Sequence, residues 1–156
     1  MKKIFLTIFA LCAVISIVLL TVSAKDVWNG SVASGFEGGN GTNDDPYIIK
    51  TAEQLAYLSV AVKNGKNYSG KFIKLANDIV LNEEKMFAYD KNGVITGAAK
   101  GKTPNEWTAI GNSEYYFSGT FDGDGHEIKG IYINKSNKDY LGLFGYCQKA
   151  TIKNVG

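Results

Sequence analysis

The sequence predicts an all-β solenoid, in which short strands stack as successive rungs and an amphipathic helix caps the first rung. Three observations support this fold class. Short apolar segments with a two-residue periodicity fill the chain after residue 65. Two of them, 128–131 and 152–155, align at a spacing of 24 residues (152 against 128). One helix-like segment, 51–63, comes just before the first of these strands.

The first 24 residues have the features of a secretory signal peptide. Two lysines near the N-terminus precede an uncharged apolar run over residues 4–22, which closes with the small-x-small pattern Val22-Ser23-Ala24. A retained membrane anchor is the alternative, because the run is about long enough to span a bilayer. The cleavage pattern and the polar Lys25-Asp26 favour removal of residues 1–24. We therefore expect a secreted or cell-surface, extracytoplasmic protein that contacts no membrane after cleavage.

The charge balance disfavours two classes of partner. Residues 1–24 hold two lysines and no acid, so cleavage changes the balance from 17 against 15 to 15 against 15. Every cation is Lys, because the sequence contains no Arg. A neutral chain without the bidentate donors that read guanine and phosphate is not typical of nucleic-acid binding. The same balance argues against binding to a membrane surface.

Residues 25–50 form a Gly- and Asn-rich N-terminal segment, and residues 51–65 are predicted to form the capping helix. Thr51 and Gln54 have the spacing of a capping box. The pair Asn64-Gly65 is a helix-termination signal. Apolar residues recur at three- and four-residue steps along one face of this segment: Ala52, Leu55, Leu58, Ala61 and Val62.

Residues 66–156 are expected to form the rungs. Strand-like segments lie at 71–75, 79–82 and 107–111 and within 115–134 and 140–156. The polar residues 83–106 between them are predicted to form a side loop. Gly130 and Asn154 interrupt the two aligned segments, where we expect a left-handed backbone corner. A compact α+β domain is the alternative fold.

The chain stops at Gly156 within a predicted rung, which suggests truncation at the C-terminus. Further repeats of the same chain would then be a natural neighbour of the last rung. Because that rung has no cover, we expect residues 25–156 alone to be marginally stable or self-associating.

Four segments carry a resemblance to a known family. Residues 119–128, 140–145 and 150–156 resemble the GLUG-motif repeats of bacterial surface proteins, and residues 45–58 are similar to the stretch that opens such arrays. The resemblance covers about residues 28–156. It implies a right-handed parallel β-helix in an adhesin-like protein, or in the non-catalytic region of an IgA-cleaving peptidase. The repeats of this family mark architecture and carry no defined active site.

The candidates for metal or catalytic chemistry are weak. His126-Glu127 begins a zinc-protease pattern, but position 130 is Gly instead of the second His. Asp122 and Asp124 start like a calcium loop, yet the closing acid is missing and a turn between strands is favoured. The same two carboxylates could form a glycosidase pair, but one of them would need a raised pKa.

Cysteine and tyrosine are two further residue types that could contribute to function. Cys147 is the single cysteine after cleavage, and we expect a packed thiol rather than a nucleophile. Tyrosines are dense in the second half of the chain and suit a binding surface for protein or sugar, although alternation sends about half of them inward. They are Tyr115, Tyr116, Tyr132, Tyr140 and Tyr146.

These observations predict a non-catalytic scaffold or adhesin. We assign no catalytic, cofactor-binding or metal-binding residue and no cofactor. The expected partners are host or cell-surface proteins or glycans. One alternative is a carbohydrate-active enzyme of the lyase or glycosidase kind. Another is the non-catalytic N-terminal part of a larger surface peptidase.

Overall fold

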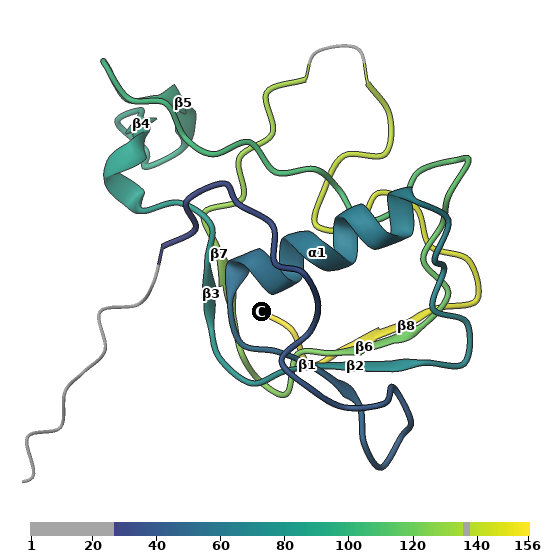
Figure 1. Cartoon of the computed structure of the whole chain (residues 1–156). Helices are drawn as coiled ribbons and strands as arrows, with labels where there is room; N and C mark the ends of the chain where they lie inside the picture. Colours follow the sequence, from purple (N-terminus) through teal and green to yellow (C-terminus); the bar gives the residue numbers. More distant parts are fainter. Residues whose placement is uncertain (1–26, 136–137) are drawn as a thin grey trace, which may run out of the picture.

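The computed structural model describes residues 27–135 and 138–156 (Figure 1). The predicted signal peptide, residues 1–24, lies outside them. The described residues form one α-helix, a short 3₁₀ turn at Glu84–Met86 and eight strands. In chain order these are β1 (Tyr47–Ile49), α1 (Ala52–Lys63), β2 (Phe72–Leu75), β3 (Ile79–Val80), β4 (Phe87–Tyr89), β5 (Ile95–Ala98), β6 (Thr120–Asp122), β7 (Ile128–Lys129) and β8 (Thr151–Lys153).

The strands pair into three small sheets. A parallel sheet has the order β1-β2-β6-β8, a second parallel pair joins β3 to β7, and β4 and β5 form an antiparallel hairpin. In the four-stranded sheet, Tyr47 lies opposite Ile73, Ile73 opposite Phe121, and Phe121 opposite Ile152. Parallel strands require long connections, and here those connections contain α1, the hairpin and the loops.

Helix α1 begins and ends as its sequence predicts. The Thr51 side chain accepts a hydrogen bond from the backbone of Gln54, and the Gln54 side chain accepts one in return from the backbone of Thr51. This reciprocal capping box is confirmed. At the other end, Gly65 has a positive φ of 91°, and Lys66 donates to the Ala61 carbonyl.

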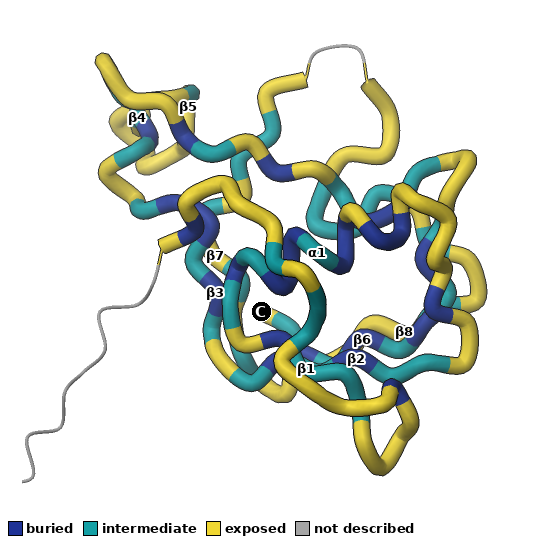
Figure 2. The backbone as a smooth tube through the Cα atoms, viewed as in Figure 1, coloured by how far each residue is buried: buried dark blue, intermediate teal, exposed yellow. Residues whose placement is uncertain are grey.

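One hydrophobic core joins α1 to the strands. Leu55, Leu58 and Val62 of the helix are fully buried, as the apolar stripe predicts. They belong to the same cluster as Ile73 and Phe121 of the sheet. In Figure 1, α1 crosses the middle of the molecule, with the four-stranded sheet and the β3–β7 pair on two sides of it. Figure 2 shows the buried residues along the sides of α1 and the strands that face this centre.

The predicted fold class, a right-handed parallel β-helix, is wrong for the described residues. They contain one helix with small parallel and antiparallel sheets and no closed solenoid. Only one side of the core carries four paired strands among the described residues. A second side has the β3–β7 pair, and elsewhere isolated bridges such as Ile110–Phe144 and Phe117–Cys147 connect the segments. Without a closed coil to cap, α1 is a core helix rather than the roof of a stack.

The predicted repeat fails for a related reason. Ile128 pairs with Ile79, and Ile152 pairs with Phe121, so the two aligned segments belong to different sheets. Their similarity is local, because each segment is a strand followed by a left-handed residue. Gly130 has a φ of 73° and Asn154 a φ of 53°, which confirms the predicted corners. The two segments therefore share a left-handed corner without being successive copies of one structural repeat.

The predicted side loop, residues 83–106, contains the β4–β5 hairpin. This hairpin projects from the rest of the molecule in Figure 1 and is mostly exposed, with Phe87 buried at its base. Among the described residues, no helix has the length and apolar character needed to cross a bilayer.

Candidate functional site

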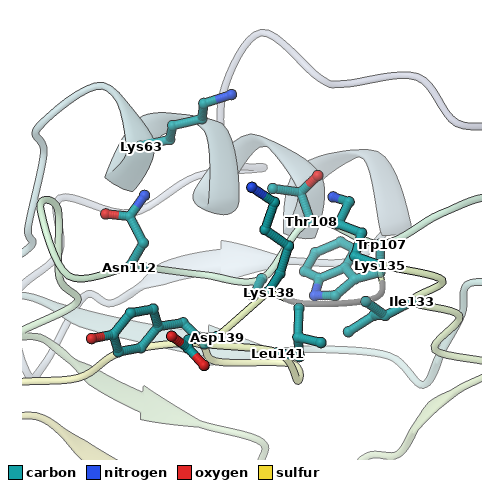
Figure 3. Close-up of a pocket in the computed structure, with 12 residues that line it drawn as sticks. Lys63, Trp107, Thr108, Asn112, Ile133, Lys135, Lys138, Asp139 and Leu141 are labelled. Carbon is teal, nitrogen blue, oxygen red and sulfur yellow. The ribbon is translucent and has the colours of Figure 1, made fainter.

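A cleft of about 450 Å³ lies between three walls: the C-terminal end of α1, residues 107–112, and residues 133–135 with 138–141 (Figure 3). We call it the lysine cleft, because Lys63, Lys135 and Lys138 line it, and Asp139 is the one acid among the described residues that line it. Its other lining residues are Trp107, Thr108, Ala109, Gly111, Asn112, Ile133, Tyr140 and Leu141.

Backbone and side-chain hydrogen bonds hold the walls of the cleft. Ser59 of α1 is buried and donates through Oγ to the Thr108 carbonyl at 2.8 Å. This bond fastens the wall of residues 107–112 to the helix. Trp107 donates through its backbone to the Tyr132 carbonyl at 2.7 Å and through Nε1 to the Leu143 carbonyl at 3.3 Å. The buried Trp107 therefore ties its own wall to Tyr132 and Leu143, which lie just before and just after the lining residues from Ile133 to Leu141. Two buried residues, Ser59 and Trp107, therefore hold the walls of the cleft together.

The cleft is cationic. All three lysines are exposed, and none of them forms an ion pair with another described residue. In Figure 3 the ammonium groups of Lys135 and Lys138 point toward the side where α1 lies, whereas the Asp139 carboxylate lies on the opposite side. Three ammonium groups and one carboxylate in an open cleft favour a ligand with several negative charges.

Polar and aromatic groups accompany the charge. Asn112 uses its Oδ1 to accept hydrogen bonds from the backbones of Glu114 and Tyr115, at 2.9 and 2.8 Å. This leaves its Nδ2 to donate toward the cleft. Tyr140 and Leu141 are 42% and 47% exposed and supply an apolar surface beside the charges. An exposed phenol ring of this kind can stack on the C–H face of a sugar while its hydroxyl stays in water.

The structure brings three of the five predicted tyrosines together. Tyr146 contacts Tyr140 edge-on with ring centroids 5.5 Å apart and Tyr116 with centroids 6.5 Å apart. This tyrosine row begins in the lysine cleft at Tyr140 and continues away from it. Tyr132 instead packs near Phe87 of the hairpin base, and Tyr115 belongs to a separate hollow near Gly65. Three of the five tyrosines therefore form one aromatic surface. The sequence indicated such a surface but not which tyrosines belong to it.

The cleft lysines were not predicted from the sequence. Lys63 ends the helix, and the other two belong to a polar segment far along the chain. Lysines are scattered through the whole sequence, so no local pattern marks these three. The nearest signal was Tyr140, which the sequence did single out.

Asp122 and Asp124 do not form an open acidic site. Lys153 Nζ lies 3.1 Å from Asp122, and Lys74 Nζ lies 2.9 Å from Asp124, so each carboxylate has its own cation. Burial raises the pKa of Asp122, but hydrogen bonds from the Asp124 backbone, Asn154 and Lys153 outweigh that effect and leave the pKa below its ordinary value. A general acid of a glycosidase needs the opposite shift.

His126 is likewise engaged within the fold. Its Nδ1 lies 3.2 Å from Asp78 Oδ1, and the same oxygen accepts a hydrogen bond from the Glu127 backbone. Across residues 27–135 and 138–156, no group of three or more His, Cys, Asp and Glu side chains is placed to hold a metal ion.

Cys147 is half-buried against the core, close to the expected packed thiol. Burial raises the pKa of the Cys147 thiol, and the thiolate is the nucleophilic form. This environment disfavours nucleophilic chemistry at neutral pH.

The chain is similar to parts of two much longer proteins. One, which has the provisional name Gly-rich membrane protein, comes from Evansella cellulosilytica. It is 35% identical over 116 residues, which is 72% of this chain and 11% of that protein. The other is a halomucin from Haloquadratum walsbyi, 31% identical over 119 residues, which is 75% of this chain and 1% of that protein. No protein-family model matches the chain, and no solved structure matches it significantly. The resemblance to GLUG-motif repeats therefore stays a prediction.

Proposed function

We propose that this protein is a non-catalytic, extracytoplasmic module of the cell surface that binds acidic glycans in the lysine cleft. The observation that carries the proposal is a group of three lysines that form no ion pair with any residue of 27–135 and 138–156, around a cleft that also exposes Tyr140. Uronate or sulfate groups would pair with the ammonium groups. The sugar rings would contact Tyr140 and Leu141.

Three further observations support the location. Residues 1–24 have the features of a signal peptide. The names of the two similar proteins, a membrane protein and a halomucin, agree with a place at the cell surface. The resemblance to surface-protein repeats points the same way.

A titration with two sugars tests the binding proposal. The purified protein is titrated by calorimetry with a galacturonic acid hexamer and, in parallel, with neutral maltohexaose. We expect the acidic hexamer to bind at least tenfold more tightly and its affinity to fall as salt is added. Equal affinity for the two sugars would contradict the proposal, because the lysines would then contribute nothing.

Matched lysine variants locate the site. The triple variant Lys63→Gln, Lys135→Gln and Lys138→Gln should bind the acidic hexamer about tenfold more weakly, since each exposed pair contributes roughly 0.5 kcal/mol. The control replaces three exposed lysines in or next to the hairpin: Lys91→Gln, Lys100→Gln and Lys102→Gln. An equal loss in both variants would show diffuse charge attraction instead of a site.

The same samples test the rival class. We expect the acidic hexamer to be recovered at full length after long incubation with the protein. Shorter or unsaturated products would favour the alternative of a carbohydrate-active enzyme.

A further inference from the structure

A smaller hollow adjoins the lysine cleft. It has a volume of about 190 Å³ and lies between the N-terminal segment, α1 and residues 106–108. Trp107 and Thr108 line both spaces, so the two share a wall. We call the smaller space the tryptophan hollow, because both tryptophans of the chain line it. Its other lining residues include Trp28, Val32, Ala56, Ser59, Val60 and Glu106.

The tryptophan hollow and the lysine cleft lie end to end along one face of α1. Ala56, Ser59 and Val60 line the hollow. Lys63, which follows them on the helix, lines the cleft. These positions differ by steps of three and four residues and therefore share one face. At a rise of about 1.5 Å per residue, Lys63 lies roughly 10 Å along the axis from Ala56. Adjoining units of one ligand chain can therefore occupy the two spaces.

Hydrogen bonds and ring contacts hold the walls of the tryptophan hollow together. Ala33 donates through its backbone to the Glu53 carbonyl at 3.0 Å, which fixes the N-terminal segment against α1. Asn105 Nδ2 donates to the Trp28 carbonyl at 2.5 Å, and the rings of Trp28 and Trp107 meet edge-on with centroids 5.8 Å apart. These contacts join the same segment to residues 105–107. The hollow is therefore part of the folded structure.

The tryptophan hollow offers mainly apolar contacts. Val32 and Val60 are 47% and 39% exposed, which leaves their methyl groups accessible to a ligand. Ala56 and Trp28 also line it. The Ser59 hydroxyl is bonded to the backbone carbonyls of residues 108 and 109 and adds no free donor. An acetamido group, which carries a methyl, suits such a surface better than a charged sugar substituent does.

Glu106 is the one charged residue among the described residues that line the tryptophan hollow. It is exposed, and its Oε1 accepts a hydrogen bond from the Asn134 backbone at 3.2 Å. Within residues 27–135 and 138–156, Glu106 forms no ion pair. A uronate placed here would face a like charge, whereas a uronate in the cleft would face three lysines. The charges therefore favour an acidic unit in the cleft and an uncharged unit in the hollow.

We propose that the glycan bound in the lysine cleft alternates a uronate with an N-acetylhexosamine, and that one acetamido group lies in the tryptophan hollow against Val60 and Trp28. This inference rests on the proposed function, because it extends the same site to the next sugar unit. The uronate pairs with the lysines, and the acetamido methyl contacts the valine side chains. The Glu106 carboxylate accepts hydrogen bonds from sugar hydroxyls and repels a second acid.

Three hexasaccharides test this inference by calorimetry on the unmodified protein. The first alternates glucuronate with N-acetylglucosamine. The second alternates glucuronate with glucose, so it has the same charges and no acetamido group. The third is neutral maltohexaose. We expect the first to bind about fourfold more tightly than the second, the effect of one buried methyl group, and the second more tightly than the third.

The same titrations separate the two proposals. Equal binding of the two acidic hexasaccharides, both tighter than maltohexaose, would overturn this inference and leave the proposed function intact. Acidic hexasaccharides that bind no more tightly than maltohexaose would overturn both.

Two single variants locate the acetamido group and the uncharged unit. Val60→Ser should weaken the binding of the N-acetylated hexasaccharide about threefold and leave the glucose-containing one unchanged. Its control, Val94→Ser in the exposed hairpin, should change neither. Glu106→Gln should strengthen the binding of a galacturonic acid hexamer, in which every unit is charged, about twofold at low salt. Equal losses for both hexasaccharides with Val60→Ser, or no gain with Glu106→Gln, would overturn this placement.

Discussion

The side chain of Asn82 pairs with the backbone of Asn105 in both directions. Asn82 Nδ2 donates to the Asn105 carbonyl at 2.9 Å, and the Asn105 N–H donates to Asn82 Oδ1 at 2.7 Å. The same Nδ2 donates to the Gly130 carbonyl at 2.8 Å. Since Asn82 is 3% exposed, one amide joins three segments of chain out of contact with water. This is a backbone-like pairing made by a side chain.

The Asn82→Ala variant tests the strength of this junction. It leaves one N–H and two carbonyl groups of the backbone without their partner, and each buried unsatisfied group costs roughly 1 kcal/mol. We expect the free energy of unfolding, measured by urea titration, to fall by about 3 kcal/mol. The exposed Asn92→Ala in the hairpin turn is the control and should change it by less than about 0.5 kcal/mol. A loss at Asn82 no larger than the control would contradict this account.

A pair of glycine variants separates backbone strain from close packing. Gly130 has a φ of 73°, and a Cβ there would lie 2.1 Å from the Asn82 carbonyl oxygen. Gly125 has a φ of 82° with no heavy atom within 4 Å of such a Cβ. Gly125→Ala should therefore cost about 1 kcal/mol of unfolding free energy, from the left-handed conformation alone. Gly130→Ala should cost at least twice as much, and equal losses would mean that the close approach relaxes freely.

The Asp122–Lys153 ion pair predicts that the free energy of unfolding depends on pH in the acidic range. Because the folded-state pKa of Asp122 lies below its ordinary value of 3.8, the carboxylate stabilises the fold above that pH. The contribution is lost as the pH falls through the folded-state pKa. We expect Asp122→Asn to lower the free energy of unfolding at pH 7 and the difference from the original protein to shrink below about pH 4. A difference that is constant from pH 7 to pH 2.5 would refute the ionic contribution.

We expect the Cys147 thiol to be alkylated slowly in the folded protein. Burial raises its pKa, so the thiolate fraction near pH 8 is smaller than for an exposed cysteine. We expect iodoacetamide to react at least tenfold more slowly with the folded protein than with the urea-unfolded chain at the same pH. The raised pKa also means that this group favours the folded state below about pH 9 and that the benefit is lost at higher pH. Equal rates in both states would show an accessible thiol.

Local features of the structure agree with the sequence wherever neighbouring residues decide them. The capping box of Thr51 and Gln54, the buried stripe of α1 and the left-handed corners at Gly130 and Asn154 all arise from interactions within a few residues. The strands at 72–75 and 79–80 follow from β-branched and aromatic side chains in the same way. Segment 107–111, also predicted as a strand, keeps a single bridge at Ile110.

The sequence by itself determined α1, most short strands and the turns between them, because hydrogen-bond and side-chain preferences act over a few residues. The tertiary structure decided which strands pair, and it placed Ile152 beside Phe121 instead of in register with Ile128. It also decided that three lysines from separate segments share one cleft and that Asp122 and Asp124 meet cations. These contacts depend on how the core closes around α1, which no local pattern specifies.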